Sequence, residues 1–139
     1  MNTNTCIYSE DEVFPDFLVG KERAALERWN NGDPLGYLEI SALDVVYFDP
    51  FSAGRLDGLE KLTQLYESIR GQVHVDRYEM LHPKVQAGSN MAVLTFNLIS
   101  HEGNDCQQWN CTEVYRQEAN GEWKIIQTHW SFTQPKLQY

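Results

Sequence analysis

Apolar residues follow two kinds of spacing along the chain. In segments 13–31 and 58–69 they recur every three or four positions, and this spacing predicts amphipathic helices. Elsewhere β-branched and aromatic residues gather in runs that are typical of strands, most of them after Gly71. The strands are expected at 43–48, 73–85, 91–100, 107–116 and 123–132.

Turn-forming residues separate these elements. Asp33-Pro34 predicts the start of a second, short helix, because aspartate caps helices and proline suits their first turn. Asp49-Pro50 ends the first strand, and residues 51–57 are expected to form a loop. Asn120-Gly121 predicts a hairpin turn, since both residues tolerate positive φ. A bend is expected at Pro83.

The order of the elements indicates the class of fold. Helices dominate the first half and four strands follow one another in the second, which favours an α+β domain over a parallel, doubly wound one. With 139 residues the chain has the size of one domain. We expect a polar arm at 1–12, a single domain at 13–134 and a short tail at 135–139.

The net charge of −9 limits the partners that are expected. Nucleic acids and anionic membranes bind surfaces rich in lysine and arginine, so neither is expected to bind this chain. No apolar run reaches the roughly 20 residues that span a bilayer. The cysteines are odd in number, and residues 1–12 lack the pattern of a signal peptide. We therefore expect free thiols and a cytoplasmic protein.

Several short motifs occur in an order that is typical of one superfamily. They are Asn31-Gly32-Asp33, Phe48-Asp49-Pro50, Leu81-His82-Pro83 and a closing hairpin made of Thr112–Arg116, Asn120-Gly121, Trp123–Ile126 and His129–Ser131. Their order resembles the nuclear transport factor 2-like superfamily. The similarity extends to its SnoaL-like, ketosteroid isomerase-like group and to the association domain of calcium/calmodulin-dependent kinase. It covers about residues 13–134.

The resemblance implies a fold and a kind of site. The fold is a cystatin-like roll, in which a strongly curved mixed or antiparallel sheet forms a cone with N-terminal helices packed on its concave face. The cone encloses a cavity for a small organic molecule, and members usually form homodimers through the sheet. Enzymes of this kind transfer protons without a cofactor, as in isomerisation, cyclisation or dehydration.

Asp49 is the first candidate catalytic residue. It resembles the aspartate that ketosteroid isomerases use as a general base, after their first strand and just before a proline. A carboxylate at the mouth of an apolar cavity can move a proton between carbon atoms. The alternative is that Asp49 only caps the turn before Pro50, where aspartate is common.

Glu113 is the second candidate. It matches the strand position where the isomerases hold a protonated aspartic acid as a hydrogen-bond donor. If the side chain points into the cavity, burial should raise its pKa and keep it a neutral donor. If it points outward, it is a solvated glutamate on a strand.

Two departures from the resembled groups bear on function. The helical tyrosine that the isomerases use to stabilise an oxyanion corresponds to Ala25, which cannot donate a side-chain hydrogen bond. The two pocket arginines of the kinase association domains correspond to Glu113 and Trp130. These replacements leave two alternatives, an enzyme and a non-catalytic dimerisation or assembly domain.

Aromatic residues are abundant, with four Trp, seven Tyr and six Phe, and they can either line a pocket or fill a core. Strict alternation along the last strand places Ile125 on the face opposite Thr128. The same alternation predicts an aromatic wall with one acid, suited to a neutral or cationic flat molecule. The candidate ligand-binding residues are Trp29, Tyr47, Tyr66, Trp109, Cys111, Tyr115, Thr128 and Trp130.

No metal or cofactor site is expected. The four histidines lack the spacing of metal ligands among themselves and with the cysteines. The sequence also contains no glycine-rich phosphate loop or dinucleotide fingerprint. Any chemistry is therefore expected to be cofactor-independent.

Overall fold

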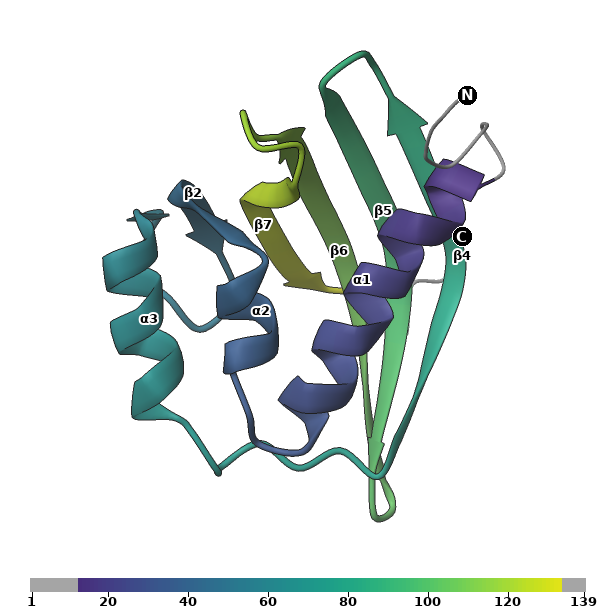
Figure 1. Ribbon diagram of the computed structural model, residues 1–139. Coiled ribbons are helices and arrows are strands. Elements are labelled where there is room, and N and C mark those ends of the chain that lie inside the picture. Colours follow the sequence, from purple (N-terminus) through teal and green to yellow (C-terminus); the bar gives the residue numbers. More distant parts are fainter. Residues whose placement is uncertain (1–12, 134–139) are drawn as a thin grey trace.

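The computed structural model describes residues 13–133 (Figure 1). The polar arm expected at 1–12 and the tail expected at 135–139 lie outside the described residues. The elements are α1 (Val13–Asn30), α2 (Leu35–Glu39), β2 (Ser41–Phe48), β3 (Leu56–Asp57), α3 (Leu59–Ser68), β4 (Arg77–Ala87), β5 (Met91–Glu102), β6 (Asp105–Gln117) and β7 (Trp123–Phe132). Among the described helices, none is long and apolar enough to cross a membrane.

A curved, mixed sheet forms the frame of the domain. Its strand order is β3-β2-β7-β6-β5-β4, so the four strands after α3 form an antiparallel meander. β2 runs parallel to β7 and inserts beside it, while every other neighbouring pair is antiparallel. Figure 1 shows α1 and α2 over one face of this sheet and α3 beside β2. The α+β class expected from the sequence is confirmed.

The core lies between the helices and the inner face of the sheet. The apolar stripe of α1 is buried as its spacing predicts, and alternate residues of β5 and β6 face it. Burying one large apolar side chain contributes about 1.5–3 kcal/mol, so these positions dominate the stability of the domain. The largest fully buried apolar side chains are Leu18, Leu26, Val45, Leu62, Leu94, Tyr115 and Ile125.

The segment before β4 differs from the sequence prediction. Residues 73–76 were expected to belong to the strand, but β4 begins only at Arg77. The amide of Val75 instead donates to the carbonyl of Asn30 at 3.1 Å, and the amide of Asp76 donates to the carbonyl of His101 at 2.7 Å. These bonds tie the segment to the end of α1 and to β5, so its apolar residues are used in a crossing and not in a ladder.

Two strands depart from ideal geometry. β7 pairs Gln127 with Val114 but Ile125 with Tyr115, so Ile126 is an extra residue in a bulge. Because of this bulge, Ile125 and Thr128 are both buried, and the prediction that they lie on opposite faces is wrong. The bend expected at Pro83 coincides with an irregular register between Leu81 and Lys84 and a φ of 54° at His82.

The segment expected to be a plain loop at 51–57 contains one more strand. Leu56 and Asp57 form the short strand β3, which pairs with Tyr47 and Val46 of β2. This pairing places the turn that begins at Asp49 at the edge of the sheet, on the side of the core that the helices do not cover.

Two glycines join the end of α1 to the end of α3. Gly32 and Gly71 have φ values of 87° and 80°, which favour glycine, and the amide of Gly71 donates to the carbonyl of Gly32 at 2.9 Å. A Cβ atom on Gly32 would lie 3.0 Å from the Cα atom of Gly71. This close approach fixes the start of the segment that crosses from α3 to β4.

Candidate functional site

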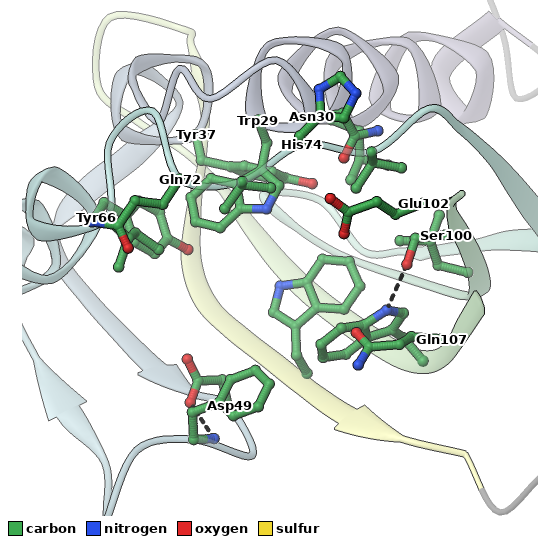
Figure 2. Close-up of a pocket in the computed structure, with 18 of the residues that line it drawn as sticks. Trp29, Asn30, Tyr37, Asp49, Tyr66, Gln72, His74, Ser100, Glu102 and Gln107 are labelled. Atoms are coloured by element: carbon green, nitrogen blue, oxygen red, sulfur yellow. Dashed lines mark hydrogen bonds between the residues drawn. The ribbon is translucent and has the colours of Figure 1, made fainter. Parts of the chain in front are cut away.

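A cavity of about 770 Å³ lies between the sheet, the ends of the helices and the crossing segment 72–75. Seven of the residues that line it are aromatic, and it is open to solvent at a polar rim. Figure 2 shows Trp29, Tyr37 and Tyr66 on one side of this space and Asp49 on another. The aromatic lining residues are Trp29, Tyr37, Tyr47, Phe51, Tyr66, Trp109 and Trp130.

The aromatic side chains form two groups, and the rings within each group are in contact. Tyr66 is central to the first, with ring centroids 4.8 Å from Trp29 and 5.5 Å from Tyr47. In the second group, the Trp109 and Trp130 centroids are 5.8 Å apart with nearly perpendicular rings. Edge-to-face pairs of this kind hold their rings in fixed orientations, so the wall has a defined shape.

Asp49 is fixed on the cavity wall where β2 ends. Its Oδ1 atom accepts hydrogen bonds from the backbone amides of Phe51 and Ser52, at 2.8 and 2.7 Å. Its Oδ2 atom accepts a hydrogen bond from the Tyr47 hydroxyl at 2.7 Å. A carboxylate offers about four acceptor sites, so Asp49 keeps one for a ligand. The turn-capping role and a place on the cavity wall are thus combined in one residue.

Tyr66 extends this arrangement into the protein. Its ring packs edge to face against the ring of Tyr47, whose hydroxyl donates to Asp49. Burial, before any other cause, raises the pKa of Tyr66 and of Tyr47, so both phenols keep their protons. Packing from α3 thus holds in place the phenol of β2 that binds the carboxylate.

A second acidic region lies behind the cavity wall. Glu22 of α1 is fully buried, and its two carboxylate oxygens accept hydrogen bonds from the hydroxyls of Tyr37 and Tyr115, at 2.6 and 2.7 Å. Glu113 of β6 is also fully buried, and its Oε1 atom accepts a hydrogen bond from the Thr128 hydroxyl at 2.5 Å. We call Glu22, Tyr37, Glu113, Tyr115 and Thr128 the buried carboxyl cluster.

Glu113 carries a proton in this cluster. Desolvation, followed by the charge of Glu22, raises the pKa of Glu113 well above its ordinary value, and the hydrogen bond from Thr128 acts in the opposite direction. The Oε2 atom of Glu113 meets no hydrogen-bond donor, as expected for the oxygen that bears the proton. Glu113 therefore keeps its proton beside Glu22, so the two adjacent carboxyl groups are not both charged.

Cys111 adjoins this pair. One ligand atom each of Glu22, Cys111 and Glu113 lies within 4.8 Å of the others, a spacing that could hold a metal ion. Burial, then the two carboxyl groups, raises the pKa of the Cys111 thiol, so a cation would have to displace protons from both Cys111 and Glu113. The phenols already satisfy Glu22, which favours a protonated cluster over a metal centre.

The residues proposed from the sequence fall into two groups. Six of them line the cavity, namely Trp29, Tyr47, Asp49, Tyr66, Trp109 and Trp130. The other four are buried behind the wall and do not line it, namely Cys111, Glu113, Tyr115 and Thr128. Glu113 does face inward, but the inner face at this end of β6 is covered by α1. Roles for all ten residues in binding or catalysis remain predictions.

Sequence reasoning missed Glu22 and the acidic rim. Glu22 interrupts the apolar stripe of α1 between Leu18 and Leu26, and a charged residue within such a stripe is the signal that could have identified it. Glu102 and Asp105 line the rim of the cavity at the tip of the β5–β6 hairpin. Two acids beside a turn give no comparable signal.

Comparison with known proteins agrees with this geometry. The model of the SnoaL-like domain family matches residues 23–135. A Parabacteroides distasonis protein, described as a proposed ketosteroid isomerase, is 41% identical; the match covers 87% of this chain and 89% of that one, with a TM-score of 0.79. No match was found among curated protein sequences.

More distant structures share the fold alone. An NTF2-like protein of unknown function from Pseudomonas putida is 20% identical over 94% of this chain and 96% of its own, with a TM-score of 0.77. The CaMKII hub of S. rosetta is 18% identical over 85% of this chain and 95% of its own, with a TM-score of 0.69. The expected cystatin-like fold is confirmed, and it is shared by enzymes and assembly domains.

Proposed function

Because the chain belongs to the SnoaL-like domain family, we propose that it binds a small organic molecule in the cavity and isomerises it without a cofactor. Asp49 is the proton acceptor. One observation carries this proposal. The Asp49 carboxylate is held in one orientation on an aromatic wall by three donors, and one acceptor site remains for a substrate.

The proposed step moves a proton between two carbon atoms. Asp49 removes a proton from a carbon that lies between a carbonyl group and a carbon–carbon double bond, and the electron pair shifts toward the carbonyl oxygen as a dienolate forms. The protonated Asp49 then returns the proton to the far carbon of that double bond, which restores the carbonyl and moves the double bond into conjugation with it. A positioned general base of this kind contributes about 10²–10⁴-fold in rate.

The enolate oxygen needs a hydrogen-bond donor, and the structure narrows the choice. The hydroxyls of Tyr37 and Tyr47 already donate to protein oxygens. Glu113 was expected to fill this role as a protonated acid, but it does not line the cavity. A direct role for Glu113 would require a substrate or water to reach behind Tyr37, so we assign it to supporting the wall.

The first assay uses a 3-oxo-Δ5 steroid, the substrate class suggested by the name of the Parabacteroides distasonis relative. Conversion to the conjugated Δ4 isomer is followed by its ultraviolet absorbance. Asp49→Asn should lower kcat by about 10²–10⁴-fold without unfolding the protein. Asp16→Asn, an exposed aspartate on α1, is the matched control and should keep full activity. Full turnover by Asp49→Asn would remove Asp49 from the mechanism.

We also propose that the chain forms a homodimer through the outer face of its sheet. On this face the partly buried Val93 and Thr95 of β5 pair with Val114 and Thr112 of β6. A patch of small β-branched residues on neighbouring strands can pack against a second copy of the chain, which is the assembly role that was considered as the alternative function. Light scattering over a concentration series should give twice the monomer mass; a monomer at all concentrations contradicts the proposal.

A further inference from the structure

We propose that the ligand of the cavity is an organic cation, an amine or quaternary ammonium group carried on a flat apolar body. This inference rests on the proposed function, because it specifies the class of molecule that the same cavity binds. It follows from three features of the wall, which are its charges, the direction of its hydroxyl groups and its aromatic faces.

The charges on the cavity wall have one sign. Asp49, Glu102 and Asp105 line the cavity, whereas no lysine or arginine among residues 13–133 does. Within the described part of the chain, the only basic lining residues are His74 and His101, and each contacts a carboxylate, Asp76 at 2.9 Å and Glu79 at 2.8 Å. A protonated histidine would therefore be balanced by its own partner and would not neutralise the wall.

The arginines near these elements are committed elsewhere. Arg28 pairs with Asp33 and Glu39 at 2.9 Å in both cases, and Arg116 pairs with Asp44 and Glu118 at 2.9 and 2.8 Å. None of these pairs lies on the cavity wall. A molecule in the cavity thus meets negative charges without their counterions.

The carboxylates of the wall have no cationic partner in the described part of the chain. Asp49 accepts only from neutral groups, a phenol and two amides. Glu102 and Asp105, at the tip of the β5–β6 hairpin, have no side-chain partner among residues 13–133. Figure 2 shows the carboxylates of Asp49 and Glu102 on opposite sides of the cavity. A cation between them is attracted from both sides.

Two tyrosine hydroxyls on the cavity wall already use their protons within the protein. Tyr37 donates to Glu22, and Tyr47 donates to Asp49. Neither phenol has a second proton to donate, so toward a ligand each can only accept a hydrogen bond. These two groups therefore favour a ligand that donates hydrogen bonds.

The aromatic faces supply the remaining attraction. Trp29, Trp109 and Trp130 line the cavity, and the face of an indole ring attracts an organic cation more strongly than other aromatic rings do. The same faces pack against a flat apolar body. A neutral ligand would use only the second of these interactions.

The test compares three probes of one shape: 2-naphthylmethylammonium, 2-naphthalenemethanol and 2-naphthoate. Binding to the full chain is measured by calorimetry and by amide shifts of cavity residues in NMR at low salt. The ammonium probe should bind about tenfold more tightly than the alcohol, in line with cation–π and charge attraction, and the naphthoate should bind most weakly. A trimethylammonium analogue distinguishes a hydrogen-bonding amine from a quaternary cation.

Two isosteric variants locate the source of the preference. Asp49→Asn combined with Glu102→Gln should lower the ammonium-to-alcohol affinity ratio well below about tenfold, because two of the three wall carboxylates lose their charge while Asp105 and the tryptophan faces remain. Glu60→Gln, an exposed change outside the cavity, should leave the ratio unchanged. NMR dispersion of each variant confirms that it is folded.

Each outcome decides something different. Equal binding of alcohol and ammonium, or tighter binding of naphthoate, overturns the cationic ligand while the binding function stands. An affinity ratio that is unchanged in the double variant overturns the assignment of Asp49 and Glu102 as a source of the preference. Failure of all three probes to shift any cavity residue overturns the proposed binding function itself, and with it this inference.

Discussion

The domain contains two acidic regions on either side of the same wall, and they behave differently. The buried carboxyl cluster holds Glu22 and Glu113 away from water, where phenols satisfy one carboxylate and a proton on Glu113 removes the second charge. On the cavity side, Asp49 is held by neutral donors and keeps an open acceptor site. Tyr37 belongs to both regions, because its ring lines the cavity and its hydroxyl binds Glu22.

The comparison shows that surroundings, and not residue type, decide what a carboxyl group does here. Without water, two adjacent carboxylates cannot both stay ionised, so the pair becomes a rigid structural element. A carboxylate that is open to solvent and to ligand can instead accept a proton or attract a cation. The cluster therefore sets the shape of the wall on which Asp49 acts.

The largest difference between the two regions is expected in the pH dependence of stability. The pKa of Glu113 is raised in the folded protein, so its stabilising contribution is complete at low pH. That contribution is lost as pH rises from the ordinary value of 4.5 through the raised folded value. Glu113→Gln keeps the shape of the protonated acid but cannot ionise. Its melting temperature relative to wild type should therefore rise steadily between pH 5 and pH 8.

The control for this experiment is Glu60→Gln on the exposed face of α3. Its melting temperature should follow that of the wild type at every pH. If Glu113→Gln also follows the wild type, Glu113 is ionised in the folded state and the description of the cluster as protonated is wrong.

A smaller difference is expected when one phenol hydroxyl is removed from each region. Tyr115→Phe leaves the fully buried Glu22 short of one donor and should lower the free energy of unfolding by about 1–3 kcal/mol. Tyr47→Phe should cost only about 0.5–1.5 kcal/mol, since Asp49 keeps two backbone donors. Urea denaturation measures both, and equal losses would contradict the distinction between a sealed and an open region.

Most of the fold was predictable from local patterns. The helix spacing of 13–31 and the run 123–132 correspond to α1 and to the observed bounds of β7, because such periodicities reflect which face is buried. Residues 73–76 were misassigned because their β-forming side chains are used in a crossing held by Asn30 and His101. Local propensity contains no information about such distant partners.

The site was predictable only in part. Asp49 and the tryptophans were identified because aromatic residues and a strand-ending aspartate form recognisable patterns. The partnership of Glu22 and Glu113 joins residues on different elements, and the bulge at Ile126 shifts which residues of β7 face inward. Both depend on how α1 and the sheet pack, which strict alternation along a single strand cannot describe.

The glycine pair at 32 and 71 determines which positions beside the cavity can be changed in a redesign. A side chain at Gly32 would meet the backbone of Gly71, so a mutagenesis library gains nothing from either position. Gln72 and His74 line the cavity, while the segment is anchored through the backbone of Val75. Randomising 72 and 74 with both glycines retained would therefore sample new ligand preferences on an unchanged backbone.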